Sequence, residues 1–316
     1  MEWSYEDGTL TVRPDGPFSA AETLFCGQCF RWRQGPGCFE GVVHGRALTL
    51  RERGDGAVLL TGLAESDAPY FLHYFAFDED YAALQRRLER SKRLAECIRC
   101  APGIRVLHQD FFEVLLTFII SQNNNIPRIT GIVARLCEGF GAPLPGGGHA
   151  FPLPGDLAGR TAEELAFLRA GWRAGYLLDA AQKVASGEVG RERLARLSTP
   201  EARALLMTIR GVGPKVADCV LLYGLGRAEA CPMDVWMKRA MARRFPRGMP
   251  RCARELAGVA QQYIFHAERT APQPQAGDSE KKERPSPGPR GKRTAPPREP
   301  ESGATRTGAF SRGAAP

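Results

Sequence analysis

The sequence predicts an α+β protein in which an antiparallel β-sheet precedes a larger, mostly helical body. Over residues 1–64, apolar and polar residues alternate in short runs separated by Gly and Pro, as in antiparallel strands. From Asp67 the apolar residues recur with a helical period. After Thr270 the residues Pro, Gly, Ser, Lys and Arg dominate, which predicts a disordered basic tail. We therefore expect three parts: a sheet with its first helices over 1–100, a helical part over 101–269 and a tail over 270–316.

Short runs rich in large apolar residues mark the expected strands, at Leu10–Val12, Phe30–Trp32, Gly41–Val43, Ala47–Leu50 and Val58–Leu60. Helical spacing predicts helices over Ala68–Ala76, Asp80–Ser91, Arg93–Cys100, Asp110–Ile120 and Ile126–Gly139. The helix over 110–120 is apolar on most sides, so we expect it to be buried. Pro127 stands in the first turn of the next helix, where proline is tolerated.

The second half of the helical part begins with a loop rich in Gly and Pro over residues 141–156. Thr161-Ala-Glu-Glu164 has the spacing of a capping box and predicts the start of a helix. Further helices are expected over Gly175–Ser186, Pro200–Ile209, Lys215–Leu225, Asp234–Arg244 and Arg251–Ala267.

The charge of the chain favours a polyanionic partner without identifying one. The 316 residues are 43% hydrophobic, enough for a large core, and the formal net charge is +8. About half of this excess lies in the predicted tail, which carries nine Lys and Arg against five Asp and Glu. The tail either adds nonspecific affinity for DNA or is a solvated extension. Because the rest is only mildly basic, any assignment to DNA depends on local motifs.

The chain shows no sign of secretion or of a membrane span. The first residues, Met1-Glu2-Trp3-Ser4, do not resemble a signal peptide, and the longest apolar run, near Val114–Ile120, is too short to cross a bilayer. Nine cysteines, an odd number, fit a reducing compartment. We therefore expect an intracellular protein without a membrane partner.

Two C-x-x-C pairs, Cys26/Cys29 and Cys97/Cys100, raise the alternative of a four-cysteine zinc site. We favour it less, because no knuckle-like pattern surrounds the second pair. A redox role for the first pair is also disfavoured, because no helix-opening pattern follows it. An iron–sulfur cluster would need four closely spaced cysteines after Asp234, where only Cys252 occurs.

The segment Ile209-Arg-Gly211-Val-Gly213-Pro-Lys215 is the most informative part of the chain. A Gly-x-Gly turn between two helices places backbone N–H groups at the start of the second helix, which suits a DNA phosphate. A lysine follows the turn, and Asp234 lies 19 positions after this lysine. The turn would hold DNA, the lysine could act as a nucleophile and the aspartate could assist it.

Lys215 and Asp234 each have a second interpretation. A lysine attacks a sugar carbon only as the neutral amine, which requires burial or a neighbouring positive charge, and Lys215 could instead contact a phosphate. Asp234 stands where a helix begins, so it could serve as an N-cap. The two roles of Asp234 are compatible, because a cap would also fix its carboxylate near the site.

This hairpin with its Lys/Asp pair resembles the helix-hairpin-helix (HhH-GPD) DNA glycosylases, and within them the 8-oxoguanine DNA glycosylase/AP lyases. The resemblance covers about residues 3–268. It implies a TBP-like sheet domain before the helical glycosylase body, and excision of 8-oxoguanine opposite cytosine from double-stranded DNA. It also implies that Lys215 attacks C1′ to give a Schiff base, with strand cleavage by β-elimination, while Asp234 supports the charge that develops on the sugar.

The resemblance also implies the partners and cofactors. We expect a monomer that acts on duplex DNA containing oxidised guanine, in the nucleoid of a bacterium or the nucleus of a eukaryote. No redox cofactor or catalytic metal is expected. A monovalent or divalent ion held by the carbonyls of Gly211 and Gly213 is a possibility that the sequence leaves open.

Further segments match this family in the pocket for the damaged base. Gly27-Gln-Cys-Phe-Arg-Trp resembles the segment whose glycine carbonyl accepts the N7–H of 8-oxoguanine, a hydrogen that guanine lacks. Cys219 and Phe265 resemble the pair that sandwiches the extruded base. Gln261, four residues before Phe265, resembles the residue that reads the pairing edge of the base.

Two segments resemble those that face the opposite strand. Ser121-Gln-Asn-Asn-Asn contains Asn123, which would fill space near the extruded base, and is followed by Arg128, which would face the unpaired cytosine. Trp172 resembles an aromatic wedge, and Arg173 resembles a second cytosine reader. Arginine suits this role because its planar fork can donate to two acceptors of one base.

The sequence departs from the family at Trp236, where a histidine is common, and at Pro214, where a small residue is frequent. These departures bear on phosphate contact and pocket shape. Two other functions stay open: a glycosylase for another damaged purine, and a noncatalytic DNA-binding module that uses the hairpin alone. A noncatalytic module would have no use for Lys215 and Asp234 together.

Overall fold

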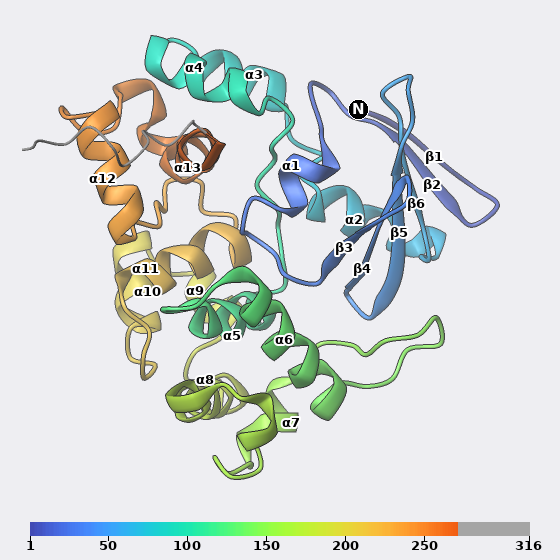
Figure 1. Cartoon of the computed structure of the whole chain (residues 1–316), viewed down its shortest axis with the longest axis vertical. Coiled ribbons are helices and arrows are strands. Elements are labelled where there is room, and N and C mark those ends of the chain that lie inside the picture. The colour runs from blue at the N-terminus through green and yellow to red at the C-terminus, as the bar shows by residue number, and fades with distance from the viewer. Residues whose placement is uncertain (271–316) are drawn as a thin grey trace, which may run out of the picture. The chain divides into compact units, whose positions relative to one another are not determined.

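The computed structural model describes residues 1–270; the predicted tail and its suggested roles lie outside this part of the chain. Six antiparallel strands form one sheet, in the order β1-β2-β6-β5-β4-β3 (Figure 1). The strands are β1 Glu2–Glu6, β2 Thr9–Arg13, β3 Trp32–Gly35, β4 Cys38–Val43, β5 Arg46–Glu52 and β6 Val58–Thr61. The α+β prediction is confirmed.

Tight turns explain the register of two strand pairs. Asp7 and Gly8 both have positive φ, at 48° and 75°, and so do His44 and Gly45, at 51° and 68°. Two consecutive residues of this kind form the turn that best matches the twist of an antiparallel hairpin. These turns bring Glu6 opposite Thr9 and Val43 opposite Arg46.

One face of the sheet is buried under two short helices, α1 Ala20–Leu24 and α2 Ala68–Tyr74. The alternation within the strands produces this face: Leu10, Val12, Leu48, Leu50 and Leu60 are at most 3% exposed. Helix α1 was not predicted, because it is only five residues long and lies within a region of strand-like runs. Ser19 caps it by accepting a hydrogen bond from Glu22 N at 3.3 Å.

A second core joins the helices of the body around α5 Phe111–Ser121, in which nine of eleven residues are buried. The other α-helices are α3 Tyr81–Leu88, α4 Lys92–Cys100, α6 Ile126–Phe140, α7 Pro154–Ala158, α8 Ala174–Ala185, α9 Arg191–Ala195, α10 Thr199–Leu206, α11 Pro214–Cys219, α12 Val235–Arg244 and α13 Ala257–Thr270. Within residues 1–270 no helix combines the length and the apolar character needed to cross a lipid bilayer.

Three expected helices differ from the prediction. The capping box forms, since Glu164 Oε2 accepts from Thr161 N at 2.7 Å, but only a turn and the 3₁₀ helix Ala166–Leu168 follow it. The chain leaves the helical conformation at Arg169, where φ is +55°. The expected helix over 215–225 divides into α11 and the π-helix Val220–Gly224. The last expected helix begins as a 3₁₀ segment, Arg251–Leu256, before α13.

The C-terminal end of the π-helical turn is held by a tertiary contact. Tyr223 O accepts a hydrogen bond from Gln109 N at 2.7 Å, so a carbonyl of this turn is used by a distant segment. Such a contact cannot be read from local spacing. Single π-turns often occur at functional sites, and this one lies beside the cavity described below.

Arg105 ties the sheet to the helical body. Its side chain is fully buried and donates to Ala76 O at 2.6 Å, Asp15 O at 2.8 Å and Pro17 O at 3.3 Å. The guanidinium also lies 4.7 Å from the centre of the Tyr81 ring. The planar fork of an arginine is well suited to hold three carbonyls at once.

We expect Arg105→Met to lower the free energy of unfolding by about 2–4 kcal/mol, because three carbonyls lose their donor in a buried place. Denaturant titration followed by circular dichroism measures this change. Arg51→Met, at an exposed position of β5, is the matched control and should change it by less than about 0.5 kcal/mol. Equal effects of the two substitutions would contradict the role given to Arg105.

Candidate active site

The glycine turn connects α10 to α11 as predicted. Gly211 has φ +79°, and a side-chain carbon placed there would lie 2.0 Å from the ring of Tyr176, so only glycine fits. Gly213 caps α11 in an extended conformation. The turn is held from outside by α8, because Asp179 Oδ2 accepts from Arg210 N at 2.8 Å. Tyr176 and Asp179 thus fix the hairpin against α8.

One small cavity brings together the two predicted catalytic residues and the four predicted base-pocket residues. Its volume is about 70 Å³, and its walls come from the turn before β3, from α5, from α11 with the π-helix, from the segment that precedes α12, and from α13. The predicted residues in its walls are Gly27, Lys215, Cys219, Asp234, Gln261 and Phe265. Cys26, Phe118, Tyr223, Pro232 and Gln262 complete the lining.

Lys215 projects over an aromatic ring inside this cavity. Its Nζ lies 4.9 Å from the centre of the Phe118 ring, which comes from the buried helix α5. Cys219 lies one turn further along the chain, and burial raises the pKa of its thiol to about 11 while the Lys215 ammonium partly opposes this rise. The thiol is therefore protonated at neutral pH and acts as an apolar wall beside the amine.

Asp234 is the N-cap of α12, which is the second role that the sequence predicted for it. Its Oδ1 accepts a hydrogen bond from Met237 N at 2.6 Å. This bond leaves Oδ2 available and holds the carboxylate at the wall of the lysine cavity. The capping role therefore fixes the carboxylate at the place where the catalytic interpretation needs it.

The wall formed by Gly27 is held rigidly from behind. Gly27 has φ +94°, and a side-chain carbon there would lie 4.0 Å from the ring of Phe265, so the two predicted pocket residues face each other. Gln28 is 1% exposed, and its side chain donates to Arg105 O at 2.7 Å and accepts from Leu107 N at 2.8 Å. These bonds fix the backbone next to Gly27.

Trp236 packs against Phe265, one of the residues that line the cavity. Its ring packs edge to face on Phe265, with 5.3 Å between ring centres and 75° between the planes. The residue that departs from the family pattern therefore contacts the ring expected to cover the base.

The residues expected to face the opposite strand also come together. Arg173 is 3% exposed and donates from Nε to Gln122 O at 3.0 Å and from Nη2 to Asn123 O at 3.2 Å. Trp172 is 53% exposed and lies against the Arg173 guanidinium at 4.2 Å. Burial lowers the pKa of Arg173, and the neighbouring Arg128 cation lowers it further. Arg173 holds the Asn-rich loop in this structure, and its reading of cytosine stays a prediction.

The backbone of the Asn-rich loop has an unusual conformation. Asn123 is exposed with φ +46°, a region that asparagine tolerates better than most residues. Asn125 caps α6 by accepting from Arg128 N at 3.0 Å. The three asparagines therefore form the turn between α5 and α6, as the sequence predicted.

Five residues of the cavity were not predicted: Cys26, Phe118, Tyr223, Pro232 and Gln262. Phe118 and Tyr223 stand in apolar runs that indicate only core packing, and no local signal separates them from their neighbours. Cys26 and Gln262 adjoin Gly27 and Gln261, so proximity in sequence was the one available signal.

The cysteine pairs do not form a metal site in the described part of the chain. No group of three or more His, Cys, Asp or Glu side chains there is arranged to hold a metal ion. Cys26 and Cys29 are buried; burial raises the pKa of Cys26 to about 12 and that of Cys29 well above its usual value. Both are therefore protonated thiols with low reactivity.

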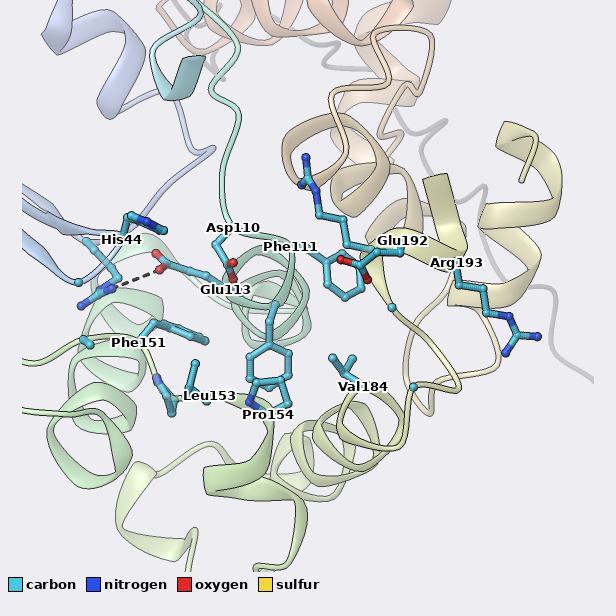
Figure 2. A pocket seen from close by; sticks show the side chains of 18 of the residues that line it. His44, Asp110, Phe111, Glu113, Phe151, Leu153, Pro154, Val184, Glu192 and Arg193 are labelled. Atoms are coloured by element: carbon cyan, nitrogen blue, oxygen red, sulfur yellow. Dashed lines mark hydrogen bonds and ion pairs between the residues drawn. The ribbon is translucent and has the colours of Figure 1, made fainter. Parts of the chain in front are cut away.

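A larger hollow lies elsewhere, beside the N-terminal end of α5 (Figure 2). Its volume is about 1100 Å³, and it contains the ion pair between Arg31 and Glu113, at 3.2 Å. Neither Lys215 nor Asp234 lines it. The smaller cavity is the better candidate for chemistry, because it unites a lysine and a carboxylate with aromatic side chains.

The fold and this site define a base-excision DNA repair protein of the helix-hairpin-helix class. Residues 12–115 match the N-terminal domain of 8-oxoguanine DNA glycosylase, and residues 116–250 match the HhH-GPD superfamily of base excision DNA repair proteins. The chain belongs to the 8-oxoguanine DNA glycosylase family.

Individual relatives agree with this assignment. A probable N-glycosylase/DNA lyase of Methanothermobacter thermautotrophicus is 31% identical over 81% of this chain and 96% of its own length. The 8-oxoguanine glycosylase/lyase of Clostridium acetobutylicum, solved with double-stranded DNA containing cytosine opposite 8-oxoguanine, is 32% identical with a TM-score of 0.79 over 85% of this chain and 98% of that one. The 3-methyladenine DNA glycosylase of Archaeoglobus fulgidus shares the fold, at 16% identity and a TM-score of 0.66 over 82% of this chain and 98% of that one.

We expect Gly211→Ala to lower the free energy of unfolding by about 2–4 kcal/mol, because the new methyl group would meet the Tyr176 ring at a positive φ. Gly213→Ala is the control within the same turn: its φ is −99° and no atom lies within 4 Å of the added carbon. It should cost less than about 1 kcal/mol. Thermal and denaturant unfolding of both variants measure the difference, and equal losses would contradict this account of the hairpin.

Proposed function

We propose that this protein excises 8-oxoguanine from duplex DNA, preferably opposite cytosine, and then cleaves the strand at the resulting abasic site. The observation that carries the proposal is the shared cavity, in which Lys215 and Asp234 stand beside Gly27, Cys219, Gln261 and Phe265. Family membership and relatives named as glycosylase/lyases support the same activity.

The chemistry follows from the lysine. With the nucleotide turned out of the helix, the neutral Lys215 amine attacks C1′ of the sugar, the bond from C1′ to the base breaks and the base leaves with the bonding electrons. Opening of the sugar ring gives a Schiff base between Nζ and C1′. Loss of a proton from C2′ then expels the 3′ phosphate, which is β-elimination, and water later releases the lysine.

Asp234 would stabilise the positive charge that develops on the sugar as the base leaves. Its carboxylate is already oriented by Met237 N, so little reorganisation is needed when the charge appears. A fixed carboxylate in a pocket screened from water interacts more strongly with a cation than one in bulk solvent.

Lesion recognition would depend on the backbone of Gly27. Its carbonyl would accept the N7–H that distinguishes 8-oxoguanine from guanine. Gln261 would read the pairing edge, while Cys219 and Phe265 would cover the two faces of the ring. On the opposite strand, Arg128 and Arg173 would face the unpaired cytosine, Asn123 would fill the space left by the extruded base and Trp172 would act as the wedge.

The remaining expectations concern cofactors and partners. We propose a monomer that works on DNA inside the cell without a redox cofactor or catalytic metal. A monovalent or divalent ion at the hairpin would be held by the carbonyls of Gly211 and Gly213. The Gly213 carbonyl already accepts from Ala217 N at 3.0 Å, so it would offer its second lone pair.

Of the alternative functions, excision of another damaged purine is the stronger. A DNA-3-methyladenine glycosylase of Bacillus subtilis is 26% identical over 61% of this chain. Gly27 lines the cavity near Phe265, which supports the proposed contact between its carbonyl and the N7–H of 8-oxoguanine. A noncatalytic DNA-binding module would not explain a cavity that contains both a lysine and a carboxylate.

The first experiment tests Lys215. Wild-type protein and Lys215→Gln are incubated with duplexes containing 8-oxoguanine opposite each normal base, with and without borohydride. Borohydride should trap the wild type covalently on the duplex with cytosine, and both trapping and strand cleavage should fall below detection in the variant. Base release without a covalent adduct would show that Lys215 is not the nucleophile and would indicate a water nucleophile. No reaction on any lesion would favour the noncatalytic DNA-binding module.

We expect Asp234→Asn to separate the two roles of this residue. The amide oxygen can still accept from Met237 N, so the free energy of unfolding should change by less than about 1 kcal/mol. The single-turnover rate of excision should fall about 100-fold or more, because the negative charge is lost. Asp218→Asn, which removes the charge from a partly buried ion pair with Arg203, serves as the contrasting variant. It should lose stability and keep most of the excision rate; the opposite result would remove Asp234 from the mechanism.

A further inference from the structure

Behind the lysine cavity, three polar side chains form a buried chain of hydrogen bonds. Gln262 Nε2 donates both to Tyr223 Oη and to Gln261 Oε1, the latter at 3.1 Å. All three side chains line the cavity and are at most 5% exposed. The residue expected to read the base is therefore bonded to a neighbour that no sequence motif marks.

The stability of the fold does not account for a glutamine at position 262. Gln262 Oε1 is the one buried side-chain oxygen or nitrogen in the described part of the chain that has no hydrogen-bond partner. A buried acceptor without a partner destabilises the folded state, and an apolar residue of similar size would avoid this loss. A role in the pocket explains why an amide is used here.

The bond between the two glutamines fixes the polarity of Gln261. An amide can present its oxygen or its NH₂ group to a base, and rotation by 180° exchanges them. Here the oxygen of Gln261 is anchored by the NH₂ group of Gln262. While Gln262 keeps its orientation, rotation of the Gln261 amide alone would place two NH₂ groups against each other, so the observed orientation of Gln261 is favoured.

The two purine edges require opposite amide orientations. The edge of a guanine-type base has an acceptor at position 6 and donors at positions 1 and 2, whereas an adenine-type base has a donor at position 6 and an acceptor at position 1. An amide whose orientation is fixed matches one of these edges and opposes the other.

We propose that Gln262, anchored by Tyr223, is a positioning residue that holds the Gln261 amide in the orientation for a guanine-type edge and so makes the pocket select 8-oxoguanine over 8-oxoadenine. This inference rests on the proposed function, because it assumes that Gln261 faces the extruded base.

Tyr223 is suited to be the fixed end of this chain. Its ring stacks on Phe118 with 5.3 Å between centres and 16° between planes, and its carbonyl accepts from Gln109 N at 2.7 Å. Burial raises the pKa of the phenol well above its usual value, so the hydroxyl stays protonated. The same Phe118 ring lies under Lys215, so one aromatic ring supports both the nucleophile and the base-reading chain.

The test compares excision of two lesions that differ only in the pairing edge. Both 8-oxoguanine and 8-oxoadenine carry N7–H and a C8 carbonyl, so the contact with Gly27 is common to them. The ratio of kcat/KM for the two lesions, each placed opposite cytosine, is measured for the wild type and Gln262→Met. We expect this ratio to fall about tenfold, because the amide of Gln261 becomes free to turn.

Two further variants serve as a control and as a second test of the proposal. Gln85→Met is the matched control, since Gln85 is also buried and donates to a tyrosine hydroxyl, Tyr263 Oη at 2.9 Å, but lies outside the cavity. It should lose comparable stability and leave the ratio unchanged. Tyr223→Phe removes one oxygen from the chain at constant shape and should lower the ratio by a smaller factor, so it carries the test if Gln262→Met does not fold.

The outcomes separate the two proposals. A wild type that excises neither lesion contradicts the proposed function itself. If the wild type is active and Gln262→Met slows both lesions equally, with a ratio within twofold of wild type, Gln262 is merely structural and the inference is wrong. The same conclusion follows if Gln85→Met lowers the ratio as much as Gln262→Met does.

Discussion

The hydrogen bonds of Gln28 are the constraint on which the candidate site depends. Its side chain donates to Arg105 O and accepts from Leu107 N, and so joins the turn after α1 to the extended segment that enters α5. The side chain of Gln109 in turn donates to Gln28 O at 2.8 Å. The buried amide of Gln28 thus joins the sheet to the helical body beside the contacts of Arg105. Because Gly27 is the residue before Gln28, the placement of the Gly27 backbone at the pocket wall follows from contacts that Gln28 makes with residues about eighty positions later in the chain. Substitutions far from the lysine can therefore change recognition of the lesion without touching the chemistry.

Helix α5 extends this constraint to the other functional groups. Its entry segment carries the bonds to Gln28, its middle supplies Phe118 beneath Lys215, and its C-terminal end leads into the Asn-rich turn held by Arg173. A helix buried on nearly all sides cannot shift without disturbing the core, since protein interiors are closely packed. The base pocket and the residues expected to face the opposite strand are therefore held at a fixed separation by one rigid element.

Local patterns predicted the parts of this protein that local physics determines. Strand alternation, the position of Gly211 and the cap at Asp234 each reflect a preference of the residues themselves, and the structure confirms them. Residues whose role depends on distant partners were not predicted. Phe118 belongs to an apolar run like many others, and only the fold places Lys215 over it. The contact of Gln109 with the π-turn at Tyr223 joins segments far apart in sequence. The helix expected after the capping box is reduced to a 3₁₀ turn although the box itself forms. The amide chain through Gln262 depends on the packing of two helices that are separate in sequence.

The size of the cavity indicates which walls must move when a base enters. A cavity of about 150 Å³ is needed to hold a benzene ring, so the observed 70 Å³ is too small for a purine. Gly27, Lys215 and Gln261 stand on supports that resist displacement: the bonds of Gln28, the ring of Phe118 and the chain from Tyr223 to Gln262. Phe265 is only partly buried, and its edge-to-face contact is with Trp236 near the start of α12, whose neighbour Val235 is 67% exposed. Displacement of these two rings therefore costs less than displacement of the recognition side. With the base-pocket roles proposed above, a base would enter by displacing the Phe265 and Trp236 rings, while Gly27, Lys215 and Gln261 stay in place.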